Sequence, residues 1–286
     1  MTDFVEIVEV GPRDGLQNEA RPIPVAEKIA LIDCLSQVGF KRIEAASFVS
    51  PKWVPQMAGS GEVLAGIKRA KGVIYSALTP NMRGFEDARA AGADEVAIFG
   101  SASEGFSRAN INASIAESLE RFRPVADAAK AAGIPVRGYI SCVVDCPYDG
   151  QVAPDAVAAV TEALFGMGCH EVSLGDTLGG ATPERVDAML EAVLNVAAPE
   201  TLAGHFHDTS GQAVDNVMVA IERGLRVFDA AVGGLGGCPY APGAAGNVAT
   251  GHLAEALGEA GFEHGLDLER LAEAAEMASR MRTGVA

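Results

Sequence analysis

Short β-rich runs alternate with longer helical patterns along the whole 286-residue chain. Seven of the eight β-rich runs are joined to the next by a segment with helical periodicity. This repeated strand–helix order favours parallel strands with right-handed crossovers, and eight such units close into an α/β fold of the (β/α)8 TIM barrel type. The predicted strands are Val5–Val10, Arg42–Ser47, Val73–Leu78, Glu95–Gly100, Val136–Val143, Glu171–Asp176, Ala203–His207 and Val227–Val232.

A doubly wound open sheet is the competing architecture, and its dinucleotide-binding form has G-x-G-x-x-G after the first strand. The first predicted strand instead ends in Gly11-Pro12-Arg13-Asp14-Gly15, which lacks that fingerprint. Two helices are expected after the eighth strand, near Val248–Ala260 and Leu268–Arg282, and the second is an addition to the basic barrel. With no linker or low-complexity tract, we expect residues 1–286 to form one catalytic domain.

The chain has a net charge of −16, from 22 Lys and Arg residues against 38 Asp and Glu residues. Such an acidic protein repels phosphate backbones, so no nucleic-acid partner is expected. An anionic small substrate needs a metal or a few arginines that make the site locally positive. No apolar run is long enough to cross a bilayer, so no membrane partner is expected.

The five cysteines are too few and too scattered for a disulfide framework, and their number is odd. Cys142 and Cys146 have no matching second pair, so a structural zinc site is rejected. The first strand pattern begins at Phe4 and leaves no room for a targeting peptide. These features predict a reducing, cytoplasmic location.

Chemically capable side chains collect where the predicted strands end, which is where barrel enzymes build their sites. Two of the five histidines, His205 and His207, lie at one strand end. The other residues at strand ends or in the loops that follow are Arg13, Asp14, Glu44, Ser47, Ser173, Asp176, Asp208, Cys238 and Asn247.

His205 and His207 are two residues apart, so both point to the same side of an extended strand. For an H-x-H motif alone, a pair of hydrogen-bonded core histidines is the more common role. The carboxylate of Asp14 and the amide of Asn247, both at other strand ends, favour a cation site instead. This mixed nitrogen and oxygen set suits Mg²⁺ or Mn²⁺.

The remaining polar residues have a structural and a functional interpretation. Arg13 could form a surface ion pair or act as a positioned guanidinium close to Glu44 on the neighbouring strand. Glu44 and Asp176 could pair with buried arginines or contact the substrate, and we treat both as supporting residues. Cys238 follows a glycine-rich run, where a thiol could be a turn residue or a proton donor on a mobile loop.

Several segments resemble the 3-hydroxy-3-methylglutaryl-CoA lyases, almost from end to end and in order. They are Val8 to Glu19, Ser47 to Gln56, Ser173 to Thr177, His205 to Thr209 and Gly234 to Tyr240. The resemblance implies cleavage of the acyl-CoA substrate 3-hydroxy-3-methylglutaryl-CoA to acetyl-CoA and acetoacetate, in leucine breakdown. Family members are commonly homodimers, and the added C-terminal helix could serve an interface.

The resemblance also implies roles for single residues. The metal ligands fall on Asp14, His205, His207 and Asn247. The catalytic group comprises Arg13, the loop thiol Cys238, the acidic helpers Glu44 and Asp176, and either His205 or Asp14 as general base. The substrate contacts are Arg13, Gln17, Ser47 and Ser173. Two departures are Ala20, where some relatives have lysine, and a chain end at Ala286 without a cysteine in its tail.

Three alternatives are kept beside this interpretation. A lyase for a bulkier 3-hydroxy-3-alkylglutaryl-CoA differs only in pocket size. A related synthase would join acetyl-CoA to a 2-oxo acid, but such enzymes typically have Arg-Asp-Glu where this chain has Gly15 after Asp14. A non-catalytic scaffold would show an eroded metal or catalytic position, and none of the positions checked is eroded.

Overall fold

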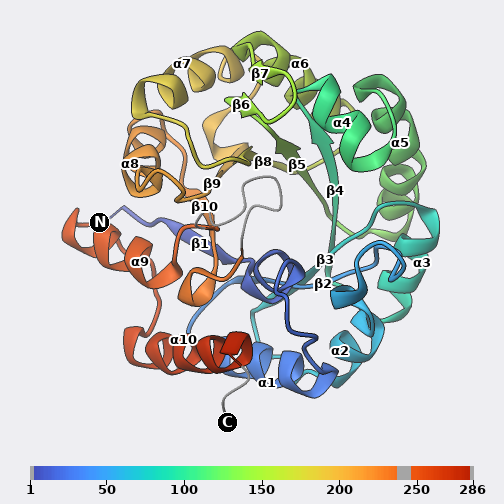
Figure 1. The fold of residues 1–286 in the computed structure, drawn as a ribbon, viewed down its shortest axis with the longest axis vertical. Helices are drawn as coiled ribbons and strands as arrows, with labels where there is room; N and C mark the ends of the chain where they lie inside the picture. Colours follow the sequence, from blue (N-terminus) through green and yellow to red (C-terminus); the bar gives the residue numbers. More distant parts are fainter. Residues whose placement is uncertain (1–2, 237–245, 284–286) are drawn as a thin grey trace.

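A closed barrel of eight parallel strands forms the centre of the computed structural model, which describes residues 3–236 and 246–283 (Figure 1). Around the barrel the strand order is β1-β10-β9-β8-β5-β4-β3-β2, so strands consecutive in the chain are also neighbours in space. The barrel strands are β1 Glu6–Glu9, β2 Arg42–Ser47, β3 Ile74–Leu78, β4 Glu95–Ser101, β5 Val136–Ser141, β8 Glu171–Asp176, β9 Leu202–Phe206 and β10 Val227–Ala230.

Helices surround this barrel as an outer ring in Figure 1. The α-helices are α1 Val25–Leu35, α2 Ser60–Gly66, α3 Met82–Ala90, α4 Glu104–Ile111, α5 Ile115–Ala132, α6 Pro154–Gly166, α7 Pro183–Val193, α8 Ala213–Glu222, α9 Thr250–Glu259 and α10 Leu268–Thr283. Short helical turns are η1 Gly11–Gly15, η2 Pro55–Met57, η3 Pro199–Thr201 and η4 Val232–Gly234. None of the described helices is long and apolar enough to span a bilayer.

The predicted barrel and the added C-terminal helix are therefore confirmed, and α10 packs against α1 and α9. Five glycines near helix ends all have a positive φ, between 67° and 112°, which other residues rarely adopt. They are Gly39, Gly92, Gly133, Gly168 and Gly224.

The structure differs from the sequence-based expectations in three places. Strand β5 ends at Ser141 because Cys142 adopts a left-handed φ of 60°. The hairpin of β6 Asp145–Cys146 and β7 Gly150–Gln151 was not predicted, since each of its strands has only two residues. The helix expected near Val248–Ala260 begins at Thr250, and Asn247 before it forms an antiparallel bridge with His207.

The two faces of the barrel strands differ in chemistry. Residues that face the helices are apolar, including Ile43, Ile98 and Leu174, which are fully buried in the main core. The lower barrel interior is charged instead. A ladder of ion pairs crosses it from Glu6 to Arg42, Glu171, Arg137 and Asp229, with N–O distances of 2.7 to 2.8 Å. This ladder ends directly below the strand ends that carry the candidate site.

Candidate metal centre and active site

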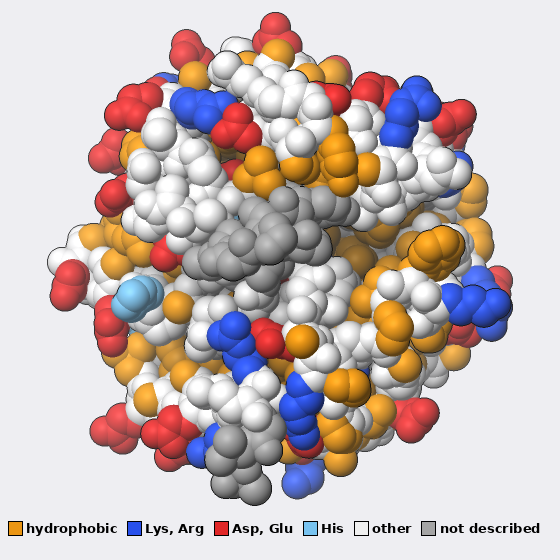
Figure 2. Space-filling model, viewed as in Figure 1, with side chains coloured by type: hydrophobic (Ala, Val, Ile, Leu, Met, Phe, Trp, Pro, Cys, Tyr) orange, Lys and Arg blue, Asp and Glu red, His pale blue; other side chains and the backbone are white. Residues whose placement is uncertain are grey.

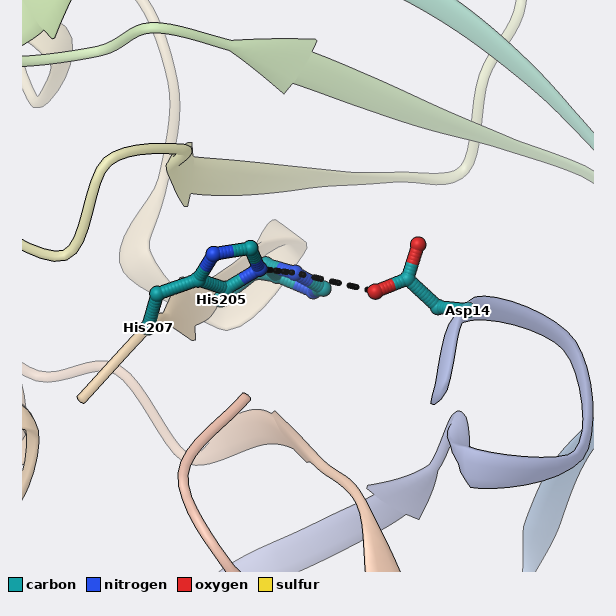
Figure 3. A group of neighbouring side chains, drawn as sticks. All are labelled: Asp14, His205 and His207. Atoms are coloured by element: carbon teal, nitrogen blue, oxygen red, sulfur yellow. Dashed lines mark hydrogen bonds and ion pairs between the residues drawn. The ribbon is translucent and has the colours of Figure 1, made fainter. Parts of the chain in front are cut away.

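Asp14, His205 and His207 lie together at the barrel mouth, as predicted, and their side chains point toward one another (Figure 3). Asp14 comes from η1 after β1, whereas His205 lies in β9 and His207 directly follows that strand. The two Nε2 atoms are 3.3 Å apart, and Asp14 Oδ2 lies 3.9 Å from His205 Nε2. One ligand atom from each residue falls within 4.8 Å of the others, which is the spacing needed to share a cation.

Asn247 joins this cluster from a segment that pairs with the end of β9. Its amide nitrogen donates a 2.8 Å hydrogen bond to Asp14 Oδ2. Its buried Oδ1 accepts no hydrogen bond from any residue in 3–236 or 246–283. A buried oxygen that accepts no hydrogen bond lowers folding stability unless a donor or a cation binds to it. Two imidazoles, a carboxylate and a free amide oxygen therefore fit a hard or borderline divalent cation such as Mg²⁺ or Mn²⁺.

His205 is held by a second carboxylate below it. Its Nδ1 lies 3.0 Å from Oδ2 of Asp229, which also accepts a 2.8 Å hydrogen bond from Ser173 Oγ. The Asp229 carboxylate is an acceptor only, because Arg137 and His205 outweigh burial and keep its pKa low. The proton of His205 is therefore on Nδ1 and Nε2 is directed at the cluster, the arrangement that metal-binding histidines usually show.

The protonation states of the cluster also suit a cation. Burial raises the pKa of Asp14, but Arg13, the two histidines and Asn247 outweigh it and lower this pKa to about 2. Burial and the neighbouring His205 lower the pKa of His207 to about 4, so His207 is neutral. For His205, burial lowers the pKa, yet Asp229 and Asp14 raise it overall. A cation bound to His205 therefore competes with a proton.

Arg13 extends from η1 between two carboxylates. Its Nε and NH2 groups lie 2.7 and 2.6 Å from Oε2 of Glu44, and NH1 lies 2.6 Å from Oδ1 of Asp14. Glu44 is fully buried, and burial raises its pKa although Arg13 opposes the shift. The guanidinium also lies over the ring of Tyr139, 5.4 Å from its centroid. Arg13 is thus fixed in direction and lines the cavity described next.

The cluster opens into a cavity of about 710 Å³, a size typical of small-molecule sites. Arg13, Asp14, His205 and His207 line it together with Gln17. Figure 2 shows a recess beside the grey atoms with hydrophobic side chains on its walls. The cavity thus has a charged part and an apolar part, as a site for an amphipathic ligand requires.

The η1 turn depends on a buried carboxylate that the sequence did not single out. Glu9 accepts hydrogen bonds from Gly11 N, Val232 N and Thr250 Oγ1, at 2.8 to 2.9 Å. A Cβ atom on Gly11 would lie 2.5 Å from Glu9 Oε1, so this position requires glycine. Glu9 therefore joins the three segments that carry Arg13 and Asp14, the glycine-rich turn η4 and the start of α9.

Other predicted site residues lie outside the cavity lining. Ser47 is buried and exchanges backbone hydrogen bonds with Ser60 Oγ. Ser173 faces Asp229, and Asp176 accepts a 2.9 Å hydrogen bond from Ala181 N in the loop that leads to α7. Their contact with substrate stays a prediction. Cys238 falls outside the residues that the structure describes.

Asp229 and Tyr139 were not predicted as site residues, although both lie within predicted strands. A charged residue between Phe228 and Ala230 was a usable signal, because alternation along the strand points its side chain into the barrel. Tyr139 carried no such signal. Its place beside Arg13 and His205 depends on how neighbouring strands align.

The model of the HMGL-like family matches residues 4–278 of the sequence. The chain belongs to this family. It is 56% identical to the 3-hydroxy-3-isohexenylglutaryl-CoA/hydroxy-methylglutaryl-CoA lyase of Pseudomonas aeruginosa, over 95% of this chain and 91% of that protein. Among solved structures, the HMG-CoA lyase of Brucella melitensis is 64% identical, with a TM-score of 0.97, covering 98% of this chain and 99% of that one.

A further member of the HMG-CoA lyases has been solved with ligands. The enzyme from Acinetobacter baumannii, in complex with coenzyme A and 3-methylmalate, is 39% identical, with a TM-score of 0.93. The alignment covers 98% of this chain and 92% of that one. The family of this chain therefore includes a protein that binds coenzyme A on the same fold.

Proposed function

We propose that this protein is a lyase that cleaves 3-hydroxy-3-methylglutaryl-CoA to acetyl-CoA and acetoacetate at a bound Mg²⁺ or Mn²⁺. The observation that carries the proposal is the convergence of Asp14, His205, His207 and Arg13 on one cavity, with the free amide oxygen of Asn247 beside them. The names of the similar proteins identify the reaction class. The acyl-CoA as substrate is supported by the relative solved with coenzyme A.

Asp14 is the proposed general base. Asp14 is ionised at any working pH, because its pKa is about 2. A divalent cation lowers the pKa of a bound hydroxyl group, which allows a weak base to accept its proton. Asp14 then takes the proton of the tertiary hydroxyl as the C2–C3 bond breaks.

Arg13 is the proposed stabiliser of the negative charge on the thioester oxygen of the departing enolate. Glu44 and Asp14 hold its guanidinium from two sides, so little reorganisation is needed during the reaction. Cys238 is proposed to protonate the enolate carbon and give acetyl-CoA. Gln17 lines the cavity and is proposed to contact the substrate. Ser47, Ser173, Glu44 and Asp176 are proposed to act as supporting residues.

The test is an assay for acetoacetate with 3-hydroxy-3-methylglutaryl-CoA as substrate. The protein is first treated with a chelator and then supplied with Mg²⁺, Mn²⁺ or buffer. We expect product only with added cation. Absence of product under all three conditions would overturn the proposal, provided that circular dichroism shows a folded protein.

A second candidate is a lyase for a bulkier 3-hydroxy-3-alkylglutaryl-CoA. It is favoured by the relative whose name includes an isohexenyl substrate and by the apolar part of the cavity. The synthase alternative receives no such support, because the similar proteins reported above are lyases. Comparison of the two acyl-CoA substrates at equal enzyme concentration separates the two lyase activities.

We further propose that residues 1–286 act as one catalytic domain in the cytoplasm, as a homodimer, in leucine breakdown. The family match over residues 4–278 supports a single domain. A reducing compartment is supported by four free cysteines in the described part of the chain. Light scattering tests the dimer, and fractionation tests the location.

A further inference from the structure

The walls of the barrel mouth divide into two halves by chemistry. The proposed metal ligands and Arg13 lie in the half that is formed by β1, β9 and the segment before α9. The opposite half has a small apolar cluster that is separate from the main core. We call it the apolar half-ring, and its members are Val49, Leu78, Ala97, Phe99 and Tyr139.

The register of the barrel explains why these side chains meet. Leu78 at the end of β3 pairs with Ala97 on β4, and Phe99 on β4 pairs with Tyr139 on β5. Ala97 and Phe99 are two residues apart, so both face the barrel interior. Leu78 and Tyr139 are 7% and 9% exposed, which places them deep in the mouth. All members except Ala97 line the cavity.

The half-ring directly adjoins the catalytic groups. The ring of Tyr139 lies 6.2 Å from the ring of His205 and 5.4 Å from the guanidinium carbon of Arg13, measured to the centroid of the tyrosine ring. If the tertiary hydroxyl of the substrate binds at the proposed metal ligands, the other substituents of the same carbon lie within reach of the half-ring.

We propose that the apolar half-ring binds the 3-alkyl substituent of the substrate, and that Leu78 limits the size of this substituent. This inference rests on the proposed lyase function. The carboxylate of the substrate is excluded from the half-ring, because burying a charge on an apolar surface is costly. The thioester arm must continue outward to the coenzyme A nucleotide, whereas Leu78, Ala97 and Tyr139 form a buried end. The alkyl group is the substituent that can terminate there.

The experiment measures kcat/KM for 3-hydroxy-3-methylglutaryl-CoA and for its 3-propyl homologue. Leu78→Ala enlarges the end of the half-ring, and Leu78→Phe fills it. We expect the ratio of propyl to methyl kcat/KM to rise by about tenfold to a hundredfold in Leu78→Ala, and to fall by about tenfold in Leu78→Phe. If Leu78→Ala does not fold, Leu78→Val is expected to raise the ratio by a smaller factor.

Leu174→Ala is the matched control. It removes the same atoms from another fully buried leucine of a barrel strand. Because Ser173 faces the barrel interior, the adjacent Leu174 faces the helices and packs in the main core. We expect the ratio of propyl to methyl kcat/KM in Leu174→Ala to equal that of the wild type. This control separates an effect of pocket size from an effect of general loosening of the barrel. Thermal unfolding shows that each variant is folded.

The outcomes distinguish this inference from the proposed function. Failure of the wild type to cleave the methyl substrate overturns the lyase function itself. If the wild type cleaves it while both folded Leu78 variants keep the wild-type ratio, the half-ring does not bind the alkyl group. An equal rise in KM for both substrates would show that the half-ring holds the pantetheine arm instead, and would also overturn the inference.

Discussion

Replacing Asp229 by asparagine tests how the charged interior of the barrel supports the metal cluster. Both oxygens of this carboxylate are in use. Oδ1 lies 2.8 Å from Arg137 NH2, and Oδ2 accepts hydrogen bonds from His205 and Ser173. An asparagine side chain offers only one oxygen. In either orientation its NH2 group faces a donor, so His205 or Arg137 loses its acceptor.

The expected loss in metal binding follows from the role of His205. Outer carboxylates that orient a histidine ligand are typically worth about 10–100-fold in metal affinity, or about 1.4–2.7 kcal/mol. Breaking a buried ion pair costs about 3–5 kcal/mol of folding stability, which a domain with a stability of about 5–15 kcal/mol can tolerate. We therefore expect a folded protein whose Kd for Mn²⁺, measured by calorimetry, is at least tenfold weaker.

Glu171→Gln is the control for lost stability. Glu171 also pairs with Arg137, at 2.7 Å, and with Arg42, at 2.8 Å, but no hydrogen bond or ion pair joins it to His205. This variant is expected to lose stability of similar size and to keep its affinity for Mn²⁺. Equal Mn²⁺ affinity in Asp229→Asn and the wild type would refute the reasoning. A parallel loss in both variants would assign the effect to general destabilisation.

Two further perturbations test other parts of the site. Arg13→Met is expected to lower kcat by at least about a hundredfold with little change in Mn²⁺ affinity, because charge stabilisation of this kind is worth about 3–4 kcal/mol; near-normal turnover would remove Arg13 from the mechanism. Burial raises the pKa of Glu9 to about 7, opposed by its hydrogen bonds, from 4.5 in the unfolded chain. The folded state therefore holds the proton of the Glu9 carboxyl group more tightly than the unfolded chain does. The stabilisation that results is complete below pH 4.5 and is lost as the pH rises through 7. The free energy of unfolding is expected to fall across that window by up to about 3 kcal/mol in the wild type. Glu9→Gln is expected to lack this slope in urea denaturation, and an unchanged slope would contradict the assignment.

Sequence reasoning succeeded for the fold where the signal was local and repeated. Each strand predicted from β-rich composition exists. The face of a strand that packs against the helices needs apolar residues such as Ile43 or Leu174, and these residues are visible in the sequence. The β6–β7 hairpin was missed because no periodicity can be detected in strands of two residues. The early end of β5 was missed because nothing marks Cys142 as a residue with positive φ.

The candidate site was predictable to the extent that parallel strands gather their ends at one mouth. Asp14, His205 and His207 were assigned on that ground, and the structure brings them together. Asp229 and Glu9, which act through other residues, were not assigned. The contact of Asp229 with His205 depends on the register of β9 and β10, and two of the three hydrogen bonds of Glu9 join segments more than 200 positions apart. Such relations arise only when the barrel closes.

The charge balance of the mouth supports the proposed role of a cation in this acidic protein. The carboxylates of Asp14 and Glu44 face the guanidinium of Arg13. His207 is neutral, and the pKa of His205 is raised. The cluster by itself therefore carries little net charge and does not offset the net charge of −16 for a carboxylate-bearing acyl-CoA. A divalent cation would make the site locally positive, and it would act strongly because the cluster is largely buried. In the proposed reaction the cation would therefore have two roles, in activating the substrate hydroxyl and in permitting the substrate to bind.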